Sequence, residues 1–314
     1  MTRRQWLFVA AAPLSAANKR VEPGAKAPSK QVKAPEVLHV PFWMDATGTV
    51  EAKLNGTSAK VLSQHNQEDD LLLLLVLDFA GDLAYVDPAR QALTELVEKL
   101  PPNTWVALMR AQDGLRTLVD PSPGRDGVVQ AIRDLGISGK AGLLETIETA
   151  ASLADTLLDR SNVRVAVLYV TDSSIYNYRE DYTNPVVNSS DGRDMSRRFP
   201  EGLIKEKIRQ LEARLATKEA PIFIVHLAYS SDRLSEAYQT GLLSLATTTG
   251  AQATICRSLA EIPTAIQQAF TAISTLRYVS IELKAAAAAK QVDVTLTAPD
   301  TVPRHRTRFV LKGR

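Results

Sequence analysis

Residues 71–82, LLLLLVLDFAGD, combine an apolar run with two acidic residues at its end. A strand covered by helices on both faces reads as a continuous apolar run, whereas a strand with one solvated face alternates apolar and polar residues. The run 71–77 therefore predicts a fully buried strand. Asp78 and Asp82 follow it, so the strand ends in carboxylates that are either simply solvated or present oxygen atoms to a metal.

Strand and helix patterns alternate after this run. An amphipathic pattern over 87–100 predicts a helix, with Asp87 as N-cap and Pro88 at the first helical position. Buried strands are expected at 163–172 and 220–229, an antiparallel pair at 104–111 and 115–119, and helices at 125–135, 142–159, 201–217, 232–249 and 258–274. The alternation predicts an α/β fold, a doubly wound, mostly parallel sheet with helices on both faces and one antiparallel strand at its edge.

The flanking segments differ in composition from this region. Residues 18–35 are rich in lysine, proline and alanine without apolar periodicity, which is typical of a flexible linker. Short apolar runs separated by turn signals, such as Asn55-Gly56, predict β-rich flanks. The expected organisation is an export signal peptide at 1–17, the linker at 18–35, a small β lead-in at 36–67, the α/β domain at 68–275 and a C-terminal β extension at 276–314.

The N-terminus has the features of an export signal. Arg3-Arg4, a short apolar run and the small residues at 15–17 resemble a twin-arginine signal, and an ordinary secretory signal remains an alternative. The apolar stretch of about ten residues is too short to span a bilayer. We expect a mature chain that is periplasmic or secreted, with no transmembrane span.

Composition and motifs exclude several classes of function. The net charge of +2 predicts neither nucleic-acid nor membrane-surface binding, and the single cysteine, Cys256, excludes an intrachain disulfide. The four histidines show no ligand spacing, and His226 is interpreted as a structural residue at a strand end. No nucleophile elbow, phosphate-binding loop or HExxH motif occurs, so we expect no enzyme.

Three loops at the carboxyl ends of the predicted strands carry the candidate site: 78–82, 138–142 (SGKAG) and 171–174 (TDSS). This arrangement resembles the von Willebrand factor type A (vWA) domain. The order of the last elements is similar to that of the VWFA-related proteins of Acidobacteria, and the resemblance covers roughly residues 37–312.

The resemblance implies a site for Mg²⁺ or a similar ion, held by a D-x-S-x-S motif, a threonine and an aspartate. Laid on this sequence, the first aspartate matches Asp78, the two serines fall on Ala80 and Asp82, the threonine on Ala141 and the last aspartate on Asp172. Two oxygen donors have become methyl groups, and one hydroxyl has become a carboxylate.

These departures predict a degenerate or weak metal site. The candidate ligands are Asp78, Asp82, Asp172 and Ser173, with Mg²⁺ or another divalent cation bound weakly or not at all; a usable divalent site is the alternative. If the site is degenerate, replacing Asp78 or Asp172 by alanine should cost only about 0.5–2 kcal/mol, as for a lost cap.

A long loop follows Asp172 and is interpreted as the rim of a protein-binding site. Tyrosine and arginine are enriched at interface hot spots, and the candidate partner-binding residues are Tyr176, Tyr178, Tyr182, Arg197 and Arg198. The alternative is a solvated insertion whose tyrosines pack locally.

The sequence therefore favours an exported, non-catalytic protein-binding module, adhesion- or scaffold-like, with partners in the cell envelope. A structural component of an envelope assembly that uses no metal is the second hypothesis. A hydrolase with a carboxylate-bound metal is the third.

Overall fold

The computed structural model describes residues 36–178, 200–286, 289–299 and 301–311. The expected signal peptide and linker lie outside these residues. So do three of the candidate partner-binding residues, Tyr182, Arg197 and Arg198.

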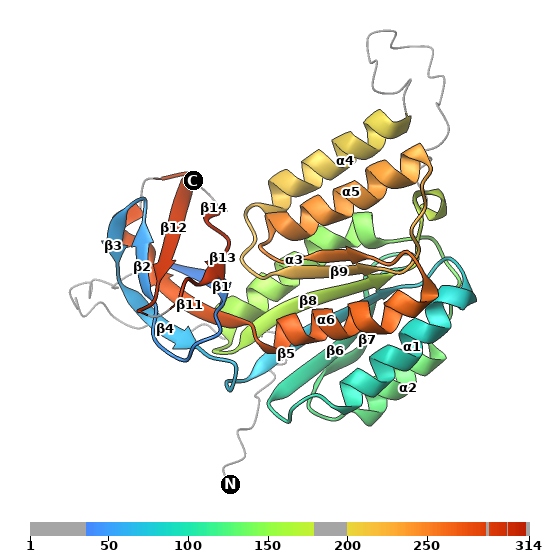
Figure 1. The fold of residues 1–314 in the computed structure, drawn as a ribbon, viewed down its shortest axis with the longest axis horizontal. Coiled ribbons are helices and arrows are strands. Elements are labelled where there is room, and N and C mark those ends of the chain that lie inside the picture. Colours follow the sequence, from blue (N-terminus) through green and yellow to red (C-terminus); the bar gives the residue numbers. More distant parts are fainter. Residues whose placement is uncertain (1–35, 179–199, 287–288, 300, 312–314) are drawn as a thin grey trace, which may run out of the picture. The chain divides into compact units, whose positions relative to one another are not determined.

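The predicted α/β sheet is present and has the order β10-β9-β8-β5-β6-β7 (Figure 1). Its strands are β5 (Leu71–Asp78), β6 (Thr104–Arg110), β7 (Arg116–Ser122), β8 (Arg164–Thr171), β9 (Ile222–His226) and β10 (Ala253–Ile255). All neighbours pair in parallel except β7, the expected antiparallel edge strand. Every residue of β5 is buried, as its continuous apolar run predicts.

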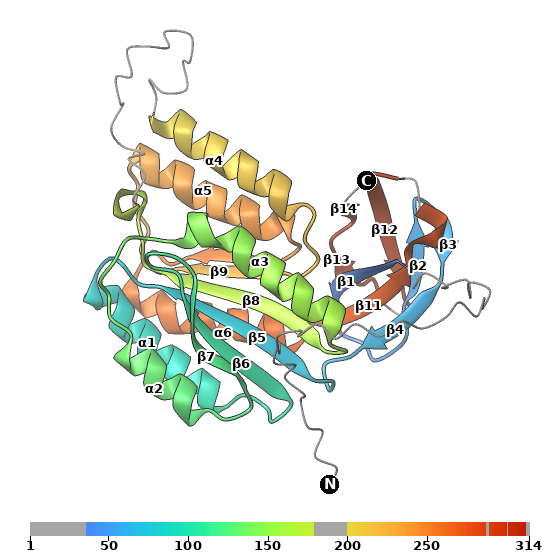
Figure 2. The same cartoon turned by 180° about the vertical axis from the view of Figure 1, so that it is seen from behind.

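Helices cover both faces of this sheet (Figures 1 and 2). One group packs together as α1 (Leu83–Glu98), α2 (Asp126–Asp134) and α6 (Ile262–Ser274), and the other as α3 (Leu143–Arg160), α4 (Pro200–Leu215) and α5 (Arg233–Thr248). The α/β doubly wound class predicted from the sequence is confirmed.

The start of α1 differs from the sequence prediction. The N-cap is Asp82, whose carboxylate accepts a hydrogen bond from Ala84 N at 2.9 Å, and Pro88 lies inside the helix. Asp87 as N-cap is therefore wrong. The Asp-Pro pair looked like a helix start, but the carbonyl of Asp82 already accepts from Tyr85 N and Val86 N, so the helix begins directly after the loop that ends β5.

The two β-rich flanks form one body. A first sheet has the order β13-β1-β11-β4 and a second the order β14-β12-β2-β3. Their strands are β1 (Val37–Trp43), β2 (Glu51–Leu54), β3 (Thr57–Ala59), β4 (Val61–His65), β11 (Arg277–Glu282), β12 (Gln291–Thr297), β13 (Arg304–His305) and β14 (Arg308–Val310). Side chains of both sheets share a hydrophobic core, including Val40, Phe42, Leu54, Val279 and Val294. The lead-in and the tail thus form a β-sandwich together, and each contributes strands to both of its sheets.

The turn at Asn55-Gly56 is as expected. Both residues have positive φ, 49° and 80°, as a two-residue hairpin turn between twisted strands requires.

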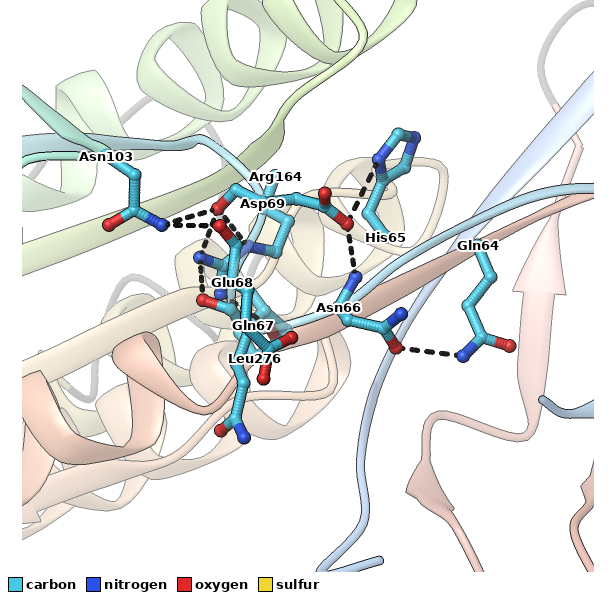
Figure 3. Close-up of polar contacts among 9 residues, drawn as sticks. All are labelled: Gln64, His65, Asn66, Gln67, Glu68, Asp69, Asn103, Arg164 and Leu276. Atoms are coloured by element: carbon cyan, nitrogen blue, oxygen red, sulfur yellow. Dashed lines mark hydrogen bonds and ion pairs between the residues drawn. The ribbon is translucent and has the colours of Figure 1, made fainter. Parts of the chain in front are cut away.

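Arg164, the first residue of β8, ties the α/β sheet to the sandwich (Figure 3). Its buried guanidinium donates to the carbonyls of Gln67 and Asp69, in the connection between β4 and β5, and to that of Leu276, directly before β11. Burial lowers the pKa of Arg164 to about 10, which leaves it charged at neutral pH. The Arg164 side chain therefore satisfies backbone carbonyls in both segments that connect the β-sandwich with the α/β sheet.

Candidate functional site

The carboxyl ends of β5 and β8 bring the predicted acidic residues together. Asp78, the last residue of β5, pairs in register with Thr171, the last residue of β8, and Asp172 follows. Ligand sites of such sheets lie at this edge. The structure thus places Asp78, Asp172 and Ser173 side by side as the sequence suggested.

The carboxylate of Asp78 is fully buried and is satisfied by the protein itself. It accepts hydrogen bonds from Gly142 N at 3.0 Å, Leu143 N at 3.2 Å and Thr171 Oγ1 at 3.2 Å. The two amides belong to the N-terminus of α3, where unpaired N–H groups favour a negative charge. Burial nevertheless outweighs these bonds and raises the pKa of Asp78 to about 6.

Asp172 accepts from the loop that follows β5. Its Oδ1 accepts from Ala80 N at 2.9 Å, and its Oδ2 from Gly81 N at 2.9 Å and Asp82 N at 2.7 Å. Three successive amides thus surround one carboxylate, which is the arrangement of an anion-binding loop. Burial raises the pKa of Asp172, and the three amides oppose that shift.

The other candidate ligands have different roles in the structure. Asp82 caps α1, as described above. Ser173 is buried, and its hydroxyl donates to the carbonyl of Asp78 at 3.1 Å. Ala80 and Ala141 contribute methyl groups where the vWA pattern has hydroxyls.

The donor set falls short of what a hard divalent cation needs. Mg²⁺ requires near-octahedral coordination by six oxygen atoms. Here two hydroxyl donors are missing, and the carboxylates of Asp78 and Asp172 each already accept three hydrogen bonds. The chemistry of these residues therefore fits a hydrogen-bonded loop cluster better than a magnesium site.

A buried polar layer lies below the loops. Tyr178 is only 7% exposed, and its hydroxyl lies 2.9 Å from that of Tyr238. His226 packs edge-on against Tyr238, and its Nε2 lies 3.1 Å from the carbonyl of Ser173. Burial lowers the pKa of His226 to about 4, so it is neutral at physiological pH.

Two candidate residues of the predicted rim loop lie within the described part of the chain, and they differ in exposure. Tyr176 is exposed, and its hydroxyl donates to Asp232 at 2.8 Å. Tyr178 belongs to the core and does not present its side chain to a partner. Asn177 between them accepts from Ser174 N and donates to Ala80 O. The start of this loop is therefore packed into the fold.

Exposed apolar residues lie at this edge, and of these the sequence analysis named only Tyr176. Four large side chains there are 41% to 54% exposed: Leu83, Tyr176, Tyr229 and Leu259. They follow β5, β8, β9 and β10 respectively. The guanidinium of Arg257 lies 5.3 Å from the centre of the Tyr229 ring. We call these five residues the apical patch.

Comparisons with solved structures find several vWA domains among the similar chains. The chain is similar to the vWF domain of the type V pili tip protein Mfa5 from Porphyromonas gingivalis, with 13% identity over 65% of this chain and 95% of that chain and a TM-score of 0.43. It is also similar to the hypothetical protein BatB from Bacteroides thetaiotaomicron (13%, 65% and 98%, TM-score 0.41) and to the SpRpn10 VWA domain (13%, 63% and 94%, TM-score 0.41). At such scores these likenesses say nothing about activity or partner.

No protein-family model matches the sequence, and the search of curated proteins finds no match. Within the part of the chain that the structure describes, no helix combines the length and the apolar character that crossing a membrane requires.

Proposed function

We propose that this chain is an exported, non-catalytic protein-binding module of vWA type, in which hydrogen bonds within the protein replace the metal of the family's site. The main observation behind the proposal is that the protein itself satisfies both carboxylates. Together, Asp78 and Asp172 accept hydrogen bonds from five backbone amides and one hydroxyl. An aspartate satisfied in this way gains little from a cation. Partner binding is then independent of Mg²⁺.

The apical patch supplies the contact surface. Tyrosine and arginine are over-represented among residues that dominate binding energy, and an apolar cluster rimmed by polar groups is typical of protein interaction sites. Tyr229 gives apolar area beside the Arg257 guanidinium, and Leu259 and Leu83 are further exposed apolar residues of the loops at this edge. The proposed partner is a protein of the cell envelope, as expected for an exported module similar to the VWFA-related proteins.

The geometry at the same edge supports the absence of catalysis. A serine, a histidine and an aspartate do meet there, because Ser173, His226 and Asp78 are neighbours. The Ser173 hydroxyl, however, donates to the carbonyl of Asp78, and His226 Nε2 contacts the carbonyl of Ser173. An activated serine requires a hydrogen bond between its hydroxyl and the base. With all three side chains buried, this arrangement supports a structural role.

Affinity capture from the native envelope tests this proposal. The wild-type chain should retain a protein partner equally well in EDTA and in Mg²⁺. A variant with Leu83→Ser, Tyr229→Ser and Leu259→Ser should lose that partner. The matched control carries Leu62→Ser and Leu118→Ser, which are similarly exposed residues on β4 and β7, and should retain it. Capture that requires Mg²⁺, or that survives the triple substitution, contradicts the proposal.

Export is tested separately. The mature chain should begin near Asn18, as N-terminal sequencing of the envelope fraction would show. An intact Met1 in a cytoplasmic fraction would end this part of the proposal.

A further inference from the structure

We propose that His39, Asp159 and Glu219 form a binding site for a transition-metal ion such as Zn²⁺, separate from the apical loops. His39 lies on β1 of the sandwich, Asp159 in the last turn of α3, and Glu219 in the connection between α4 and β9. One ligand atom from each residue lies within 4.8 Å of the other two. An ion bound here would connect the sandwich to the α/β sheet.

The spacing suits a small tetrahedral ion. Zinc bonds of about 2.0–2.1 Å at tetrahedral angles place neighbouring ligand atoms about 3.3 Å apart. His39 Nε2 and Asp159 Oδ1 are 3.6 Å apart, so a small side-chain movement completes that pair. The mixed imidazole and carboxylate donors are those that Zn²⁺ accepts.

The imidazole of His39 is oriented for a metal. Its Nδ1 lies 3.0 Å from the hydroxyl of Ser280, on the neighbouring strand β11. When Nδ1–H donates to that hydroxyl, the lone pair is on Nε2, the atom that faces Asp159. Metal-binding histidines almost always donate their other N–H in this way, which sets the tautomer and the ring orientation.

Glu219 is also fixed in place. Its backbone N donates to the buried carboxylate of Asp155 at 2.9 Å, and its Oε2 accepts from His39 N at 2.8 Å. Asp159 is 62% exposed and His39 only 17%. The exposed carboxylate of Asp159 gives an ion a path from solvent to the half-buried imidazole.

The same residues could instead form a simple ion pair. Without a metal, the contact between His39 and Asp159 is attractive when His39 Nε2 carries a proton, in the neutral or in the charged imidazole. His65 provides a comparison, because its Nδ1 lies 3.9 Å from Asp69 Oδ2, and no third ligand joins them among the residues the structure describes. His65 is therefore the matched control.

Isothermal titration of the full chain with ZnCl₂ in a non-chelating buffer tests the site. We expect one ion per chain with micromolar or tighter affinity, and at least tenfold weaker binding in each of His39→Ala, Asp159→Asn and Glu219→Gln. Asp159→Asn is the decisive variant because its exposed side chain can change without disturbing the fold, as an unchanged metal-free melting temperature would verify.

Two controls locate the ion. His65→Ala and the double variant Asp78→Asn with Asp172→Asn should both bind Zn²⁺ as the wild type does. The proposal is overturned if Zn²⁺ shows no saturable binding, if Asp159→Asn and His39→Ala leave binding unchanged, or if binding is lost in the Asp78 and Asp172 double variant.

Discussion

The carboxylate of Asp172 lies in direct contact with the backbone of Gly81. Gly81 N donates to Asp172 Oδ2 at 2.9 Å, and a Cβ added at residue 81 would meet the same oxygen at 2.6 Å. Only glycine therefore allows the carboxylate to approach all three amides of the loop.

Gly81→Ala should destabilise the fold by about 1–3 kcal/mol, because the new methyl group pushes Asp172 away from its donors. Urea unfolding measures the change. Gly48→Ala is the matched control, since a Cβ there meets nothing within 4 Å; it should stay within about 0.5 kcal/mol of the wild type. Equal effects of the two substitutions would contradict the close contact.

Asp172→Ala should cost more than the capping effect expected from the sequence. Three amides lose a charged acceptor, and a hydrogen bond to a charged group contributes about 1.5–3 kcal/mol, so the total should exceed about 2 kcal/mol. The loss should be the same in 5 mM EDTA as in 5 mM Mg²⁺, because it concerns hydrogen bonds. A loss seen only with Mg²⁺ would indicate a bound cation instead.

Asp78 and His226 should give opposite pH dependences of stability. Burial raises the pKa of Asp78 from 3.8 to about 6, so between these values the folded state holds a proton that the unfolded state releases, and stability falls as pH rises. Burial lowers the pKa of His226 from 6.5 to about 4, so the unfolded state binds the extra proton, and stability rises with pH. Each slope is at most about 1.4 kcal/mol per pH unit.

Two variants separate these slopes in denaturation curves measured from pH 4 to 6.5. Asp78→Asn keeps only the His226 contribution and should lose stability relative to the wild type as the pH falls. His226→Gln keeps only the Asp78 contribution and should gain relative stability over the same range. Parallel curves for the two variants would show that neither shift exists.

Arg164→Lys should destabilise by about 2–4 kcal/mol, although the charge is retained. Lysine cannot reproduce the planar fork that reaches Gln67, Asp69 and Leu276 together. Arg133→Lys is the control, because Arg133 is 57% exposed and, among the described residues, its ion pair is with Glu98 at 3.8 Å. Thermal unfolding that shows similar small losses for both would refute the junction role.

The sequence predicted the α/β sheet because its signals are local. The apolar run 71–77, the helical spacing after it and the Asn55-Gly56 turn each determine structure within a few residues. The sandwich could not be predicted in the same way, because β1 pairs with β11 about 240 residues later in the chain. The cluster of His39, Asp159 and Glu219 was missed for the same reason.

The sequence predicted where the residues of the candidate site lie, but it did not predict their hydrogen-bond partners. The carboxyl ends of parallel strands bring Asp78 and Asp172 together whatever fills the space between the loops. Their partners are mostly backbone amides, which every residue except proline possesses. The residue types in the sequence therefore do not indicate these hydrogen bonds. Asp82 is a further example, because the sequence analysis named it as a metal ligand, and in the structure its side chain caps α1.

Calorimetric titration with Mg²⁺ tests the central claim most directly, with the wild type compared with a variant carrying Ala80→Ser, Asp82→Ser and Ala141→Thr. Serine at 82 can still cap α1, so the variant restores the vWA donors without removing the cap. Replacement of the metal by hydrogen bonds predicts no micromolar Mg²⁺ binding by the wild type and measurable binding by the variant. Stoichiometric micromolar binding by the wild type, abolished by Asp78→Ala and unaffected by His39→Ala, would contradict it.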